Sequence, residues 1–104
     1  MLRIGHNDVG AHQVILVLEG NILLEWAELL ETECDELLRS GRRVALDFSG
    51  VVFIGRTGFQ ALTRLSRAGV EIVGCSPLIA YMLEQEGIAA SRRVRQPRPK
   101  GRAS

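Results

Sequence analysis

The chain has 104 residues, of which 46% are hydrophobic, 24% are charged and three are proline. A composition this apolar excludes an intrinsically disordered protein, and the length suits one small domain whose core needs no metal or disulfide. The net charge of +1 conceals an asymmetry, because six of the 13 basic residues and none of the 12 acids lie in residues 91–104. We therefore predict an acidic domain over residues 1–90 and a basic, disordered tail over residues 91–104.

Cysteine spacing and apolar run length bear on redox chemistry and location. Cys34 and Cys75 do not share C-x-x-C spacing, which argues against a zinc site or redox dithiol, so we predict two buried core thiols. Apolar runs such as the five-residue "VILVL" are far shorter than the roughly 20 residues that cross a bilayer. The N-terminus also lacks the basic and then apolar pattern of a signal peptide. We predict a cytoplasmic protein with no membrane insertion.

The first predicted element is a β-hairpin. One strand covers residues 2–6, a turn uses Asn7, Asp8 and Gly10, and a second strand covers residues 13–19. The apolar run in the second strand shows no alternation, which is typical of a strand that is covered on both faces. We therefore expect this strand in the middle of a sheet.

An amphipathic helix of about five turns follows Gly20 and Asn21. Acidic residues fall mostly outside its apolar stripe, and Arg39 stands near its end. Gly41 is placed to adopt the left-handed conformation that ends many helices. The apolar stripe consists of Leu23, Ala27, Leu30, Cys34 and Leu37.

A third strand and a second helix come next. The segment "RRVALDFSG" predicts a buried strand over residues 44–48, and apolar residues continue to Ile54. From Thr57 to Gly69 the apolar residues recur with helical spacing. Thr57 and Gln60 have the spacing of a capping box, so we predict that the Thr57 hydroxyl caps this helix.

The last two elements are a short strand and a helix. "VEIVG" predicts a strand over residues 70–74, and Ser76 is a predicted N-cap with Pro77 in the first turn of a third helix. Strands that alternate with helices form parallel pairs, whereas the initial hairpin adds an antiparallel pair. The sequence therefore predicts a single α/β domain with a mixed sheet.

The stretch from Gly50 to Thr57 nearly fits the phosphate-binding pattern G-x-x-x-x-G-K-S/T. Arg56 replaces the lysine, and bulky residues fill positions 51–54, where such a loop turns its amides toward an anion. A nucleotide-binding protein that uses Gly50 to Thr57 stays open as an alternative, in which Arg56 and Thr57 touch phosphate.

Other candidate sites are weak. His6 and His12 flank the predicted turn, but Asp8 alone stands near enough to be a third metal ligand. No residue pattern supplies a catalytic base, so we predict no metal, no cofactor and no enzymatic activity. Trp26, Phe59 and Tyr81 are predicted to lie in or beside the core. An exposed cluster of Ile54, Phe59 and the start of the second helix would instead form a protein-binding patch.

The sequence from residue 2 to residue 90 resembles the STAS domain, the family of anti-sigma factor antagonists and of cytoplasmic domains of sulfate transporters. The resemblance is carried by Asp47 within "LDFSG", by "FIGRTG", by Ser76-Pro77 and by Gly87-Ile88. It implies a four- to five-stranded mixed sheet with helices packed mainly on one face. This fold agrees with the element order predicted above.

Antagonists of this family carry Asp-Ser-Ser-Gly or Asp-Thr-x-Gly at the start of the second helix, and a partner kinase phosphorylates the residue after the Asp. Matched to that motif, the Asp falls on Gly55, the acceptor on Arg56, the next residue on Thr57 and the glycine on Gly58. The usual acceptor is therefore missing. We expect a binding module that stays in the unphosphorylated state, and Thr57 as the acceptor is the alternative.

The resemblance thus implies a bacterial regulator of transcription that acts in partner switching and contacts a kinase-fold anti-sigma factor. The cytoplasmic STAS subunit of an ABC-type lipid transporter is an alternative, and no specific nucleic acid is implied. The helix dipole disfavours a cation at Arg56, and an acid on the partner, Asp47 or another carboxylate at the sheet edge would offset this cost. The predicted partner-binding residues are Ile54, Gly55, Arg56, Thr57, Gly58 and Phe59.

Overall fold

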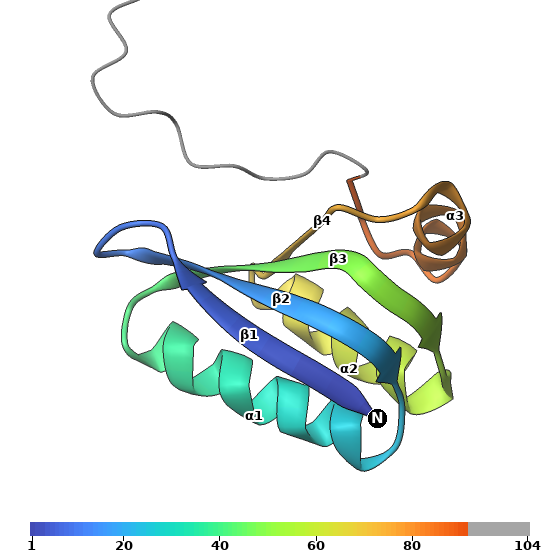
Figure 1. Cartoon of the computed structure of the whole chain (residues 1–104), viewed down its shortest axis with the longest axis horizontal. Coiled ribbons are helices and arrows are strands. Elements are labelled where there is room, and N and C mark those ends of the chain that lie inside the picture. The colour runs from blue at the N-terminus through green and yellow to red at the C-terminus, as the bar shows by residue number, and fades with distance from the viewer. Residues whose placement is uncertain (92–104) are drawn as a thin grey trace, which may run out of the picture.

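The computed structural model describes residues 1–91, which form a four-stranded sheet and three helices (Figure 1). The strands are β1 (Leu2–Asp8), β2 (Gln13–Ile22), β3 (Arg43–Ile54) and β4 (Glu71–Val73), and the helices are α1 (Glu25–Arg39), α2 (Arg56–Arg67) and α3 (Pro77–Gln85). The predicted element order is confirmed. The predicted tail lies outside the described residues except for Ser91, whose backbone bonds to Ile72 and Cys75 beside β4.

The sheet has the order β1-β2-β3-β4, with one antiparallel pair, β1 with β2, and two parallel pairs. The mixed sheet and the central position of β2 are therefore as predicted. The hairpin turn was placed too early, because Asn7 and Asp8 still belong to β1 and pair with Ile15 and Val14. Both polar residues are exposed on an edge strand. Their side chains stay hydrated there, so the strand can include them without a desolvation penalty.

Helices α1 and α2 lie together along one face of the sheet, and α3 lies apart from them near β3 and β4 (Figure 1). Helix α1 begins later than predicted, because Asn21 and Ile22 extend β2. Gly20 makes this extension feasible. It has a φ of +114°, and a Cβ there would lie 2.3 Å from the Met1 carbonyl oxygen.

All three helices end as the glycine positions indicate. Gly41, Gly69 and Gly87 have positive φ angles directly after the helix caps. In each case the glycine N–H and the next N–H bond back to carbonyls of the last turn, which is the Schellman arrangement. At the start of α3, the Ser76 hydroxyl accepts a hydrogen bond from the Ile79 N–H at 3.2 Å, so the predicted cap is confirmed.

The core joins the sheet to α1 and α2, extends to Ile79, Ala80 and Leu83 of α3, and includes both cysteines. Burial raises the pKa of the Cys34 thiol to about 12 and that of Cys75 to about 11. Trp26 and Phe59 pack against the core as predicted. Tyr81 does not, because α3 turns its opposite face inward and leaves Tyr81 60% exposed.

Strand β3 contains two irregularities that shape the candidate site. Its register with β2 shifts after Val17 and again after Gly20, and at each point β3 supplies one residue more than β2. The second shift leaves Val52 without a partner residue in β2. Such bulges turn side chains away from the face that simple alternation would give them.

Candidate functional site at the start of helix α2

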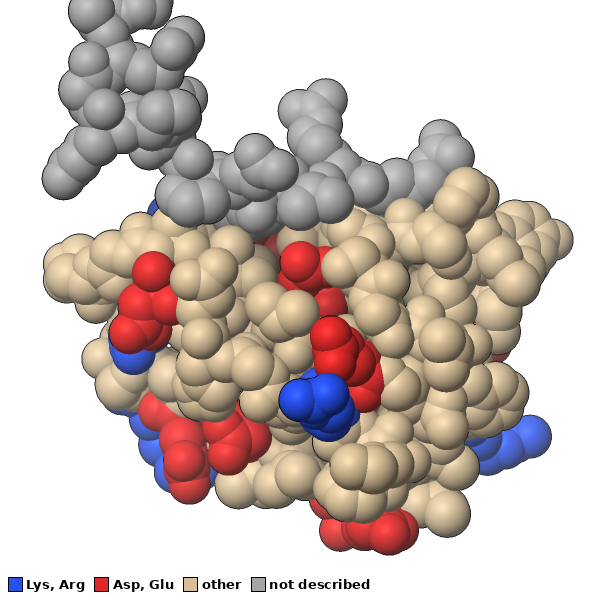
Figure 2. Space-filling model, in the orientation of Figure 1, with Lys and Arg blue, Asp and Glu red and all other residues tan. Residues whose placement is uncertain are grey.

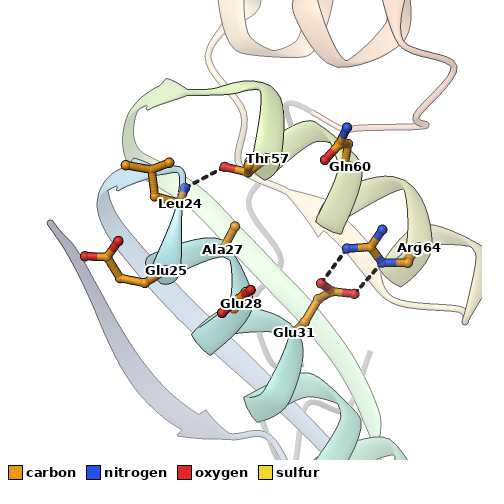
Figure 3. A pocket seen from close by; sticks show the side chains of 8 residues that line it. All are labelled: Leu24, Glu25, Ala27, Glu28, Glu31, Thr57, Gln60 and Arg64. Atoms are coloured by element: carbon orange, nitrogen blue, oxygen red, sulfur yellow. Dashed lines mark hydrogen bonds and ion pairs between the residues drawn. The ribbon is translucent and has the colours of Figure 1, made fainter.

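Helix α2 begins at Arg56, with Gly55 as its N-cap in an extended conformation and no side chain bonded to the cap. The predicted capping box is therefore wrong. The helix starts two residues earlier than a Thr57 cap would place it, so Thr57 lies inside the first turn. Its hydroxyl instead accepts a hydrogen bond from the Leu24 backbone N–H at 2.5 Å, across the gap to the loop before α1 (Figure 3).

Leu24 has an unusual backbone conformation. Its φ of 54° and ψ of −133° make it the only non-glycine residue with positive φ among residues 1–91. Residues that carry a Cβ adopt this region at a cost of roughly 1–3 kcal/mol. The side chain is also 59% exposed, so it is not burial of Leu24 that holds this conformation. The hydrogen bond from its N–H to Thr57, and those that its carbonyl oxygen accepts from the Ala27 and Glu28 N–H groups, hold this conformation.

Two glycines allow α2 to approach the end of β2. A Cβ on Gly58 would lie 2.1 Å from the Ile22 carbonyl oxygen, and one on Gly55 would lie 2.9 Å from the Leu23 Cβ. The same Ile22 oxygen accepts a hydrogen bond from the Gly55 N–H at 2.9 Å. The glycine spacing in "GRTG" therefore serves a close backbone contact.

Arg56 occupies the first helical position and is exposed. It forms no ion pair or hydrogen bond with any residue between 1 and 91. Asp47, one of the acids that we expected opposite it, bonds elsewhere: its Oδ1 accepts from the Ser49 N–H and hydroxyl at 2.9 and 2.7 Å. A cation at a helix N-terminus is disfavoured by the helix dipole, so Arg56 has no evident structural role here.

The exposed apolar residues near this turn differ from those predicted. Ile54 is buried and Phe59 is half-buried, whereas Val52 and Phe53 are 73% and 51% exposed. The second bulge in β3 explains the difference, because it leaves Val52 unpaired and puts two consecutive residues, Val52 and Phe53, on the exposed side. We call the exposed set at the end of β3, the start of α2 and the loop bonded to it the α2-start surface: Leu24, Val52, Phe53 and Arg56.

Helices α1 and α2 are also joined further along their length. The Arg64 Nε and Nη2 donate to the two carboxylate oxygens of Glu31 at 2.7 and 2.8 Å (Figure 3). This bidentate bond holds the pKa of Glu31 below its usual value. With the bond between Leu24 and Thr57, it fixes the two helices at both ends of the groove that they enclose.

The structure offers little to the phosphate-loop alternative. Residues 50–54, which such a loop would leave free, belong to β3, and Val51 and Ile54 are buried. The residues between 1 and 91 also form no cluster of three or more His, Cys, Asp or Glu side chains that could hold a metal ion. His6 lies beside Glu33 instead, with 3.2 Å between Nε2 and Oε1.

The mixed four-stranded sheet and the glycine-bounded turn into α2 define a small α/β domain of the type that the sequence predicts. Residues 4–96 match the model of the STAS domain, so the chain belongs to the STAS domain family. No protein with a curated function has a sequence that matches this chain. In the described residues, none of the helices has the length and apolar character needed to cross a membrane.

Solved structures with the same fold include two anti-sigma factor antagonists. SpoIIAA in its unphosphorylated form is 13% identical, with a TM-score of 0.70 over 89% of this chain and 90% of that one. An antagonist from Mycobacterium paratuberculosis is 15% identical, with a TM-score of 0.68 over 88% of this chain and 85% of that one. A protein with a SpoIIAA-like fold from Shewanella loihica is 11% identical, with a TM-score of 0.58 over 91% and 86%. These similarities establish the fold.

Proposed function

We propose that this chain is a non-catalytic regulatory domain that binds a protein partner through the α2-start surface. The observation that carries the proposal is Arg56, which is exposed and has no ionic partner among residues 1–91. Exposed apolar residues flank it at Val52 and Phe53. Phenylalanine and arginine are enriched in protein interfaces, and arginine is one of the residue types that dominate binding energy there.

The surface lacks a phosphorylation switch in this proposal. A phosphate adds close to two negative charges and would be stabilised at a helix N-terminus. Arg56 stands at the position of the usual acceptor and has the opposite charge. Thr57, the remaining hydroxyl, is half-buried and bonded to the Leu24 N–H. The domain would therefore bind its partner without being released by phosphorylation.

We propose a kinase-fold anti-sigma factor as the partner, in a cytoplasmic partner-switching pathway of a bacterium that regulates transcription. Two of the structurally similar proteins are anti-sigma factor antagonists, and the family membership agrees with such a role. The cytoplasmic subunit of an ABC-type lipid transporter is the competing function. Its partner would be a nucleotide-binding subunit of a membrane complex.

The test of the docking site is Arg56→Glu. We expect the tagged wild-type chain to capture a kinase-fold regulator from lysate of its own cells, and the variant to lose that capture, because the substitution reverses the charge at the contact. Arg67→Glu is the matched control, since Arg67 is an exposed arginine at the other end of the same helix. Equal capture by the two variants would refute this docking site. Recovery of transporter subunits would favour the competing function.

Thr57 gives a separate test. We expect that incubation with the captured kinase-fold partner and ATP adds no phosphate to the chain, as measured by intact-mass spectrometry. The physical reason is that the acceptor oxygen is held within a hydrogen bond to Leu24. A mass increase of one phosphate that disappears in Thr57→Ala would show that the switch has moved to Thr57, and the proposal of an unswitched domain would then be wrong.

A further inference from the structure

The groove between α1 and α2 lies directly beside the α2-start surface. Its two ends are closed by the bond between Leu24 and Thr57 and by the Glu31–Arg64 pair (Figure 3). The hollow has a volume of about 440 Å³, and the small side chain of Ala27 lies within it. This volume falls within the roughly 300–1,000 Å³ that is usual for ligand pockets. The groove is therefore large enough to take up a side chain from another molecule.

The charges that line the groove are unbalanced. Three acids of α1, Glu25, Glu28 and Glu31, line the groove with a single guanidinium, that of Arg64. Figure 3 shows the Glu25 carboxylate at the rim, directed away from Arg64. Arg64 bonds Glu31 through both of its carboxylate oxygens, so that acid is neutralised. Glu25 and Glu28 form no ion pair with any residue between 1 and 91. Two acids without an ion-pair partner therefore remain at the groove, Glu28 beside Ala27 and Glu25 at the rim, and both are exposed.

Acidic side chains gather at the lower left and along the lower edge of the molecule in Figure 2. Part of this bias stabilises the helix itself, because Glu25 and Glu28 lie in the first turn of α1, where the dipole favours negative charge. The dipole does not explain why these two acids line a hollow that reaches the α2-start surface. Leu24 and Thr57 line the groove at the end where it meets the α2-start surface, and the hydrogen bond between them joins α2 to the loop before α1.

We infer that the partner which docks at the α2-start surface inserts an arginine or lysine side chain into this groove. The inference rests on the proposed function, because it assigns a second contact to the same partner. The aliphatic stem of a basic side chain would lie on Ala27 and Leu24, and its charged head would reach Glu25 and Glu28. A neutral or acidic side chain would leave both carboxylates without a counter-charge when the groove is covered.

The two contacts together specify the orientation of the partner. Arg56 requires an anionic group on the partner, and the groove requires a cationic one, at a place fixed by the α1–α2 pair. Opposite charges at two fixed positions align only one way, so a partner with the reverse order is repelled at both. The surface would thus select its partner by the positions of the charged groups on the partner rather than by the partner's net charge.

The experiment titrates the isotope-labelled full chain with N-acetyl-arginine methylamide and follows the backbone amides by NMR. We expect the amide chemical shifts of Glu28 and Gln60, which line the groove, to change until the probe saturates its site. The citrulline analogue has nearly the same shape without the charge, and we expect no shift from it. The double variant Glu25→Gln/Glu28→Gln should weaken arginine binding by about tenfold or more.

The matched control is Asp35→Asn/Glu36→Gln, which removes two exposed acids from the same helix outside the groove. It should bind the arginine probe as the wild type does. Equal losses in both double variants, or equal shifts from citrulline, would overturn the inference. A groove that binds spermidine but not the arginine probe would take a free polyamine, and the inference of a partner side chain would also fail.

The titration uses no partner protein, so its result is independent of the capture test. Arg56→Glu serves only the capture test, because Arg56 does not line this groove. If the probe fails to bind while Arg56→Glu still abolishes capture, the groove inference is wrong and the docking proposal stands. If the probe binds and Arg56→Glu captures the partner as well as the wild type does, the docking proposal is wrong. The groove would then bind a basic side chain, but there would be no reason to assign that side chain to this partner.

Discussion

We expect Gly58→Ala to lower the free energy of unfolding by about 3 kcal/mol, at the upper end of the usual cost of overpacking. For a domain of this size the melting temperature would fall by roughly 12–24 °C. An alanine normally stabilises a helix by about 1 kcal/mol relative to glycine. The expected change therefore has the opposite sign to the one that helix propensity predicts.

The physical reason is the contact between α2 and the end of β2. The new Cβ would lie 2.1 Å from the Ile22 oxygen and 2.9 Å from the Ile54 Cγ2. Neither neighbour can move freely, because the Ile22 oxygen is bonded to the Gly55 N–H and Ile54 is buried. Relief of the overlap requires a shift of α2 away from the sheet, which would also disturb the bond between Leu24 and Thr57.

Gly5→Ala is the matched control for this measurement. Its Cβ would meet only ordinary contacts, at 3.8 and 3.9 Å from Val17 atoms. We expect no loss of stability, since the smaller entropy of the unfolded chain offsets minor effects. Thermal unfolding of the two variants, followed by circular dichroism, checks both expectations. A Gly58→Ala variant that melts with the wild type would show that the close approach of α2 is not rigid.

We expect Leu24→Gly to have the opposite effect, a gain of about 1 kcal/mol in the free energy of unfolding. Glycine relieves strain of roughly 1–3 kcal/mol at this φ and ψ, and it adds about 0.5–1 kcal/mol of backbone entropy to the unfolded state. Little burial is lost, because the leucine side chain is largely exposed. Chemical denaturation measures the difference as a higher midpoint with an unchanged slope.

Leu24→Ala separates the two contributions. Alanine removes the same exposed side chain but retains the Cβ that causes the strain, so we expect no gain from it. If alanine and glycine stabilise equally, strain at Leu24 is not the cause. A strained residue within a candidate binding surface is consistent with a contribution to binding rather than to folding. We therefore expect Leu24→Gly to weaken partner capture even as it raises stability.

Much of the fold could be predicted from local signals. The change from strand to helical spacing after Ile54 and the closing glycines at positions 41 and 69 set the element order. The buried run in β2 indicated its central position, which the pairing confirms. These features depend on a few neighbouring residues and are therefore visible in the sequence.

The candidate site was predicted less well, because its geometry depends on contacts between distant segments. Thr57 had the spacing of a helix cap, yet its hydroxyl binds Leu24, 33 residues away. The exposure of Val52 and Phe53 arises from register shifts between β2 and β3. An apolar run carries no sign of such shifts, so the sequence indicated burial. Gly50 beside the first shift is the one local signal, since a Cβ there would lie 2.9 Å from the Leu18 oxygen.

Gly55 at the N-cap of α2 has a consequence for local opening. No side chain among residues 1–91 bonds to this cap, so the first amides of α2 exchange with water more readily than those of a capped helix. A carboxylate that reaches Arg56 could also accept from these amides and supply the missing cap. Partner binding would then complete the helix as well as occupy a surface, and the first turn of α2 would become protected from hydrogen exchange only in the complex.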